Sequence, residues 1–210
     1  MSETILTFEA SSPKELRNLL SSQSQNTHPP SRFATLAVSG PQVLVRLFQF
    51  ESIPPKEIRK RLFFEAVEFL SLPVSEIELT FQILASHSTR IRGIYTCLPK
   101  KLLQDYLSVF HHAKLVPITI TAYLATCLNY FLKEPQTGEG RVCFLDFSKE
   151  KTIYLAVVSQ KKCELLREIP YENWTEAKAE ILQSLRSVCA KSPVKQFDRI
   201  YITGEHPPLD

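Results

Sequence analysis

The chain has 210 residues, of which 44% are hydrophobic and 22% are charged, and its formal net charge is +3. This length suffices for one large domain or for two subdomains with a hydrophobic core. The small net charge argues against nucleic acid as the main partner. The sequence has neither a secretory signal nor an apolar run of the roughly 18 residues that a membrane helix needs, so we expect the chain as given to be soluble.

Strands and helices alternate from the start of the chain. We predict a short strand at residues 5–9, a helix over residues 13–20 and a polar connector over residues 21–32. Two strands follow, at residues 33–39 and 43–50. The pair Pro54-Pro55 begins a helix that runs to about residue 70. Helical spacing predicts that its inward stripe consists of Ile58, Leu62, Ala66 and Phe69.

The middle of the chain predicts a hairpin followed by a helix. Strict alternation indicates a half-buried strand at residues 76–84, paired with a strand at residues 89–98 through a turn at His87-Ser88. Pro99 then precedes a helix whose inward side chains are predicted to be Leu102, Leu103, Tyr106, Leu107 and Phe110. The remaining predicted elements are a strand at 116–121, a helix at 122–132, a helix at about 173–190 and a strand at 197–205.

Residues 141–170 are the most informative segment. They predict three strands joined by tight turns, at residues 142–147, 152–158 and 163–169. The string from Asp146 to Thr152 resembles the phosphate-binding hairpin Asp-x-Gly-x-x-x-Thr of actin-like nucleotide-binding domains. Ser148 stands where that pattern has glycine, which lets backbone N–H groups approach a phosphate closely. The hairpin is therefore interpreted as a degenerate nucleotide site.

Two interpretations remain open for the charged residues of this hairpin. Asp146 is either a magnesium-linked carboxylate or, in the more ordinary interpretation, a strand-end residue that caps the next turn. Lys149 and Lys151 are either phosphate ligands or solvated side chains at the hairpin tip.

Cysteine and glycine usage narrows the class of protein. The five cysteines are widely spaced, without a Cys-x-x-Cys pair, which indicates reduced, buried thiols rather than a metal site and is typical of the cytosol. Only five glycines occur, and neither a P-loop nor a dinucleotide-binding pattern can be written from them. The glycine pattern therefore argues against P-loop and dinucleotide-binding enzymes.

Charged and aromatic side chains gather on the helix that follows Pro54-Pro55. The cations Lys56, Arg59, Lys60 and Arg61 are either a solvated face or a contact for lipid or an acidic partner. Phe63 and Phe64 cannot both lie at the centre of one apolar stripe, so we expect one of them at its edge, available to another chain. We therefore take Arg59, Arg61, Phe63 and Phe64 as candidate partner-binding residues.

His111 and His112 are adjacent on a helix and point in different directions, so they do not form a joint chelate.

The order of these parts resembles the type IV pilus assembly protein PilM. The resemblance rests on residues 53–84 (IPPKEIRKRLFFEAVEFLSLPVSEIELTFQIL), on Leu98-Pro99-Lys100 with the helix end at residues 112–115, on residues 146–170, and on Ile200-Tyr-Ile-Thr-Gly204. It covers about residues 30–205. The cytoplasmic domain of the type II secretion protein GspL belongs to the same actin-like clan.

This resemblance implies a fold and a domain organisation. The fold would be a truncated actin-like (ribonuclease H-like) α/β fold with an inserted small α/β subdomain. The first lobe would span residues 1–115, with the insertion at about 52–115, and the second core subdomain would span residues 116–210. The nucleotide-site positions carried over are Asp146, Ser148, Lys149, Thr152 and Gly204.

The resemblance also implies a function. The chain would be a non-catalytic cytoplasmic scaffold of a type II secretion or type IV pilus inner-membrane platform, at the cytoplasmic face of the inner membrane. Its partners would be the secretion or pilus ATPase and membrane-anchored platform proteins, without nucleic acid. No cofactor and no ATPase activity are expected. If the natural protein continues beyond Asp210, a membrane helix and a periplasmic domain would be expected there, as in GspL.

The chain departs from the PilM pattern in ways that leave an alternative open. The first phosphate hairpin of PilM relatives has no counterpart here, and the segments that close the adenosine side after Gly204 are absent from the sequence given. An actin-like ATPase needs both hairpins and a carboxylate-held Mg²⁺. The alternatives are a fragment of an ATP-binding actin-like ATPase or sugar kinase, and an unrelated α/β binding module. The oligomeric state stays open, with a dimer as one option.

Overall fold

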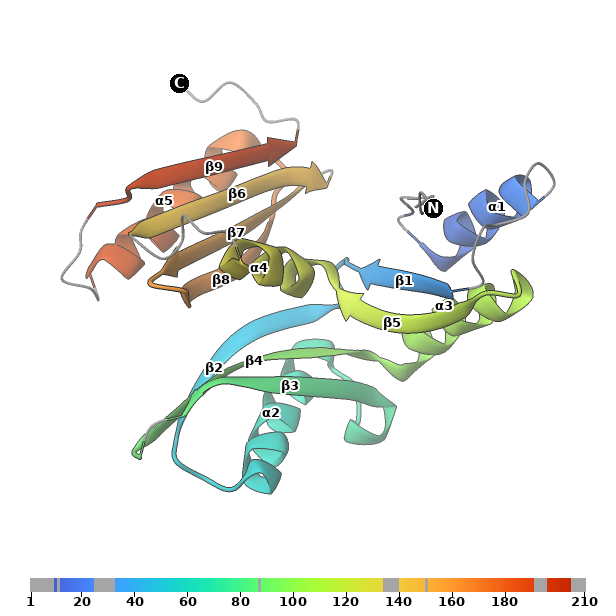
Figure 1. Cartoon of the computed structure of the whole chain (residues 1–210), viewed down its shortest axis with the longest axis horizontal. Coiled ribbons are helices and arrows are strands. Elements are labelled where there is room, and N and C mark those ends of the chain that lie inside the picture. Colours follow the sequence, from blue (N-terminus) through green and yellow to red (C-terminus); the bar gives the residue numbers. More distant parts are fainter. Residues whose placement is uncertain are drawn as a thin grey trace, which may run out of the picture. The chain divides into compact units, whose positions relative to one another are not determined.

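The computed structural model describes residues 10, 12–24, 33–86, 88–133, 140–149, 151–190 and 196–204, and the chain divides into two compact units (Figure 1). The first unit comprises Met1–Leu44 and Gln49–Tyr123, and the second comprises Val45–Phe48 and Leu124–Asp210. Our sequence-based boundary, at residues 115 and 116, falls before strand β5 (Val116–Ala122). The structure assigns β5 to the first unit, because it pairs with β1 (Phe33–Val38) of that unit.

The first unit contains two small sheets and their helices. β1 and β5 are parallel, in register from Phe33 opposite Val116 to Val38 opposite Ala122. The second sheet has the order β2-β4-β3 and consists of β2 (Leu44–Glu51), β4 (Arg90–Pro99) and β3 (Ile77–Ser86), although Val45–Phe48 within β2 count with the second unit. α1 (Pro13–Ser24) packs against α3 (Lys100–His112), which also contacts β4 and β5. The predicted helices and strands of this unit are thus confirmed, except for the strand predicted at residues 5–9, which lies outside the described residues.

Helix α2 (Pro55–Leu70) covers β3 and β4 with one stripe of side chains. Ile58, Leu62 and Ala66 are fully buried, as their spacing of four residues predicts. The prediction for Phe69 was wrong, because this side chain is 41% exposed. Phe69 lies in the last turn of α2, just before the left-handed Ser71 at φ 53° that ends the helix. Helical spacing fixes the direction of a side chain, but not whether a neighbouring element covers it at that level.

The inward stripe of α3 is also displaced from our prediction. Tyr106 and Phe110 are buried as expected, whereas Leu107 is 39% exposed and that prediction was wrong. Val109, which we did not include, is buried instead. The buried stripe therefore includes Val109 at one margin and excludes Leu107 at the other, a rotation about the helix axis of less than the 100° between consecutive residues.

The second unit is built around a four-stranded sheet of order β8-β7-β6-β9. The predicted three-stranded meander is confirmed as β6 (Arg141–Lys149), β7 (Thr152–Ser159) and β8 (Lys162–Pro170), with antiparallel pairing throughout. The chain then passes through α5 (Trp174–Ala190) and returns as β9 (Arg199–Gly204), parallel to β6. This strand–helix–strand crossover places β9 beside the first strand of the meander.

Both faces of this sheet are covered. On one face, Cys143, Leu145 and Phe147 of β6 join a hydrophobic core with buried side chains of β7, β8 and α5. On the other face, the ring of Phe144 stacks on Phe131 of α4 (Tyr123–Lys133), with centroids 3.7 Å apart. Alternation along β6 therefore divides its side chains between two packed layers.

Two further observations concern the chain as a whole. The five cysteines, all within the described residues, form no disulfide, and Cys97, Cys143 and Cys163 are buried. Among the described residues, no helix has the length and apolar character required to cross a membrane.

Candidate functional site

The five positions predicted for a nucleotide site lie together at one end of the β8-β7-β6-β9 sheet (Figure 1). Phe147, which lies between Asp146 and Ser148, is opposite Gly204 in the parallel β6–β9 pair. Lys149 is opposite Thr152 across the hairpin. The register thus brings the ends of β6 and β9 and the start of β7 to the same end of the sheet.

Asp146 is held inside the sheet at this end. Its side chain is only 4% exposed, and its Oδ1 accepts a hydrogen bond of 3.0 Å from the Thr203 hydroxyl. Thr203 is also its register partner on β9. The sequence left open a magnesium-linked carboxylate or a cap of the next turn, and neither interpretation includes this bond to β9. The bond gives Asp146 a structural role that requires no ligand.

The hairpin backbone is tightly turned. The β6–β7 register shifts between Asp146 and Lys149, and Lys151 has a positive φ of 56°. Gly204, at the end of β9, has φ 79°, a conformation that glycine adopts without strain. The side chains of Ser148 and Lys149 lie outside the described part of the structure, so their contact with a phosphate stays a prediction.

A second carboxyl group lies two strands from Asp146. Tyr154 of β7 is opposite Asp146 on one side and opposite Glu168 of β8 on the other, so the three side chains share a face of the sheet. Burial raises the pKa of the Glu168 carboxyl to about 7. We did not predict Glu168 as a site residue from the sequence, although the sequence places it directly before the buried Ile169 of β8.

The candidate partner-binding residues of α2 separate into two sets. Arg59, Phe63 and Phe64 line a groove of about 560 Å³, together with Val74 of η1 (Val74–Glu76) and with Lys56, Glu57 and Lys60 of the same helix. We call these seven residues the α2 groove. Arg61 is not one of them, and its guanidinium instead lies 5.6 Å from the centre of the Phe50 ring. The four candidate residues therefore lie on two different sides of α2.

The two phenylalanines of the groove differ in exposure, as expected. Phe64 is 68% exposed, whereas Phe63 is half-buried and carries the Arg59 guanidinium 5.3 Å above its ring. Phe63, one position after the buried Leu62, thus lies at the edge of the apolar stripe, and Phe64 lies on the exposed side of the helix. Val74 is 50% exposed, and we missed it because it comes from a separate element after the end of α2.

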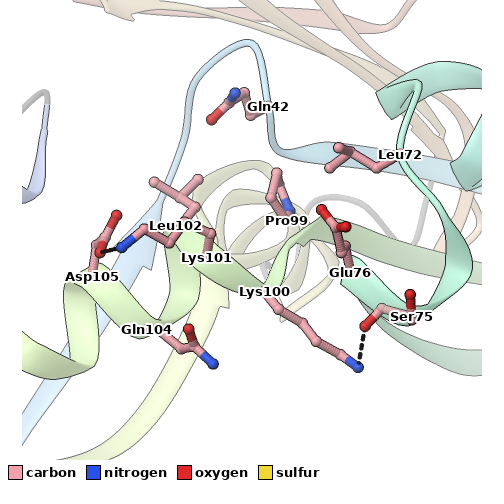
Figure 2. Close-up of a pocket in the computed structure, with 10 residues that line it drawn as sticks. All are labelled: Gln42, Leu72, Ser75, Glu76, Pro99, Lys100, Lys101, Leu102, Gln104 and Asp105. Carbon is pink, nitrogen blue, oxygen red and sulfur yellow. Dashed lines mark hydrogen bonds and ion pairs between the residues drawn. The ribbon is translucent and has the colours of Figure 1, made fainter.

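A second hollow, of about 510 Å³, lies at the start of α3 (Figure 2). Figure 2 shows Gln42, on the loop before β2, opposite Pro99 and Leu102. Its two lysines are engaged with the protein itself. Lys100 donates to the Ser75 carbonyl at 2.8 Å, and Lys101 pairs with Asp105 at 2.8 Å. No sequence pattern pointed to this hollow, because it combines residues from several separate elements.

The adjacent histidines His111 and His112 are among the residues of metal-binding type that the structure describes. The Nδ1 atom of His112 lies 2.6 Å from the Ser108 carbonyl, and the His111 and His112 rings meet edge to face at 6.1 Å. Within the part of the chain that the structure describes, no group of three His, Cys, Asp or Glu residues is placed to hold a metal ion.

Comparison with solved structures identifies the fold. No protein-family model matches the chain, and no curated protein matches it. A chain of the PilM–PilN type IV pilus biogenesis complex superposes with a TM-score of 0.62 at 17% sequence identity, covering 85% of this chain and 60% of that one. The chain therefore spans less than two thirds of that protein's length.

Two further solved structures share the arrangement. A Bacteroides thetaiotaomicron protein with an actin-like ATPase fold matches with a TM-score of 0.57 at 9% identity, over 90% of this chain and 68% of that one. The cytoplasmic domain of EpsL, an inner-membrane component of the Vibrio cholerae type II secretion system, matches with a TM-score of 0.51 at 11% identity, over 93% and 69%. The predicted actin-like fold, shared with PilM and GspL-type domains, is confirmed.

Proposed function

We propose that this chain is a non-catalytic cytoplasmic scaffold of a type II secretion or type IV pilus inner-membrane platform. The observation that carries the proposal is the shared fold, because two of the solved structures it matches are components of these two machines. Fold alone does not determine function. The proposal therefore also depends on what the chain has at the nucleotide-binding end of the fold.

That end supports a scaffold rather than an enzyme. An actin-like ATPase binds phosphates through backbone N–H groups, and glycine lets the backbone come close to the phosphate. Ser148 occupies that glycine position here. Asp146 is buried and is bonded to Thr203 within the sheet. A carboxylate used in this way contributes to the pairing of β6 and β9 whether or not a nucleotide is present. We therefore propose that no nucleotide cofactor is required.

The proposed partners are those of the machines that share the fold. The PilM structure is a complex with PilN, and EpsL is an inner-membrane component. By this likeness, we propose that the chain binds the cytoplasmic tail of a membrane platform protein, the secretion or pilus ATPase, or both, at the cytoplasmic face of the inner membrane.

Calorimetry with Mg-ATP tests the non-catalytic part of the proposal. We expect a dissociation constant in the millimolar range or weaker, which corresponds to about −4 kcal/mol or less favourable binding, and no ATP hydrolysis. Co-purification with candidate platform proteins and ATPases from pilus and secretion systems tests the scaffold part. A chain that retains none of these proteins would contradict it.

The alternative is a fragment of an ATP-binding actin-like ATPase or sugar kinase. It is favoured by one observation, namely that the four hairpin positions and Gly204 of β9 meet at one end of the sheet. The same calorimetry decides between the two. A micromolar constant that Asp146→Asn weakens would establish the nucleotide site and refute the scaffold proposal.

A further inference from the structure

The α2 groove is lined by both apolar and cationic side chains. Phe63, Phe64 and Val74 supply the apolar surface, contributed by two different elements. Three cations, Lys56, Arg59 and Lys60, line the same groove against one carboxylate, Glu57. An exposed aromatic side chain beside charged residues is typical of a protein-binding hot spot.

The cations of the α2 groove can bind carboxylate groups of a ligand. Arg59 lies with its guanidinium over the Phe63 ring, and such stacking leaves the edge of the planar group able to form paired hydrogen bonds with a carboxylate. Lys56 and Lys60 are four residues apart, so they lie one above the other on the same helix face. The groove therefore attracts acidic groups beside its apolar side chains.

The remaining faces of α2 do not share this character. Ile58, Leu62 and Ala66 are buried against the sheet, and Arg61 lies over Phe50 outside the groove. Phe64, which is 68% exposed, shares its side of the helix with Lys56 and Lys60, at spacings of eight and four residues. A helix that was merely solvated would distribute its charges without regard to the phenylalanines.

From these observations we propose that the α2 groove binds an acidic linear segment of a partner protein, which inserts one large apolar side chain between Phe63, Phe64 and Val74. The carboxylates of the segment would pair with Lys56, Arg59 and Lys60. This inference rests on the proposed scaffold function and names the chemistry of one partner segment.

The shape of the site favours a peptide over a lipid surface. The apolar side chains line a hollow of about 560 Å³, so the apolar group of the ligand must enter it from outside. A membrane-binding helix instead projects its apolar side chains outward into the lipid.

The test uses the full chain and defined probes. A fluorescently labelled synthetic peptide with a central leucine flanked by Asp and Glu is compared with two matched peptides, one with Lys in place of the acids and one with serine in place of the leucine. Fluorescence polarisation should show binding of the first peptide only, weakening with added salt because ion pairs at an exposed site are screened. Binding of the lysine peptide with equal affinity would overturn the proposal.

Variants of the chain locate the binding site. Lys60→Glu and Phe64→Ala should each weaken the acidic peptide by roughly tenfold or more. Arg61→Glu is the matched control, since it makes the same change of charge on the same helix outside the groove, and its affinity should stay at the wild-type value. All three side chains are exposed, so their melting temperatures should match. Equal weakening by Arg61→Glu and Lys60→Glu would refute the groove as the site.

Two further measurements separate this inference from the proposed function. Vesicles of phosphatidylcholine with phosphatidylglycerol should not bind through the groove, and vesicle binding that Phe64→Ala abolishes would assign the groove to a membrane instead. If wild-type chain and Phe64→Ala retain a pilus or secretion platform protein equally, the groove proposal fails while the scaffold function stands. If the peptide binds as expected but no platform protein or ATPase is retained, the scaffold function fails while the groove stands.

Discussion

A buried ion pair in the second unit provides a quantitative test of its structure. The Arg141 side chain has no exposure to solvent, and its Nη2 lies 2.9 Å from Oε2 of Glu164, which is 27% exposed. The Arg141 guanidinium also lies 5.9 Å from the centre of the Phe197 ring. The pair links the start of β6 to β8, across β7. We therefore expect Glu164→Gln to leave a cation inside the protein without its carboxylate.

The expected loss of stability comes from the Arg141 charge that stays buried after its partner is removed. Removing one partner of a buried pair costs about 3–5 kcal/mol, because the remaining charge stays desolvated. The paired Oε2 of Glu164 is buried, whereas the rest of this side chain is 27% exposed, and we expect a value near the lower end, about 3 kcal/mol. The double variant Arg141→Met with Glu164→Met removes both charges. It should therefore lose less stability than the single variants Arg141→Met and Glu164→Met added together, with a coupling free energy of about 1–3 kcal/mol.

Trp174 supplies the assay. It is the only tryptophan of the chain, and it packs against the core of the second unit with its ring 6.0 Å from Phe147. Its fluorescence during urea unfolding therefore reports on the unit that contains the pair. Glu172→Gln, an exposed glutamate of the same unit, is the matched control and should change the free energy of unfolding by less than about 0.5 kcal/mol. A Glu164→Gln variant as stable as this control would refute the reasoning.

Burial also determines the expected outcome of three further sets of substitutions. Leu62→Ala should destabilise the first unit by about 2–5 kcal/mol, whereas Phe69→Ala, at a side chain that is 41% exposed, should cost about 1 kcal/mol or less; equal thermal shifts would contradict this difference. Burial raises the pKa of Glu168 to about 7 from 4.5, so its carboxylate disfavours folding increasingly as the pH rises between these values. Glu168→Gln should therefore stabilise the protein by about 1–2 kcal/mol at pH 8, with the shift discounted for partial exposure, and by almost nothing at pH 4; a gain that is the same at both pH values would be inconsistent with the raised pKa. Gly140→Ala would push its new Cβ into the Asp198 carboxylate and should lower the thermal midpoint, while an unchanged midpoint would show that Asp198 moves aside freely.

Local patterns predicted the elements of this fold well. The three strands of residues 141–170 and the helix after Pro54-Pro55 were predicted within one or two residues, because alternation, helical spacing and proline at a helix start all act over short distances. The resemblance to actin-like domains named Asp146 and Gly204 as positions of one site, and the register of β6 and β9 places them at the same end of the sheet.

Contacts between distant segments were not predictable in the same way. The bond from Thr203 to Asp146 joins residues 57 positions apart and depends on β9 lying beside β6. The pair of Arg141 and Glu164 depends on the register of three strands, which the alternation of single strands does not specify. Val74 was missed as part of the α2 groove for the same reason, since the sequence of α2 does not indicate which later residue packs beside its phenylalanines.

The bond between Thr203 and Asp146 changes how the phosphate-hairpin pattern is interpreted. The buried Asp146 carboxyl accepts a hydrogen bond from the adjacent parallel strand and so links β6 to β9 without any ligand. Retention of Asp146 is therefore expected in a scaffold as well as in an ATPase, and by itself it does not favour either. Position 148 carries more information, because a glycine there would serve mainly the approach of a phosphate to the backbone. The serine at this position is consequently the stronger sequence argument for a scaffold.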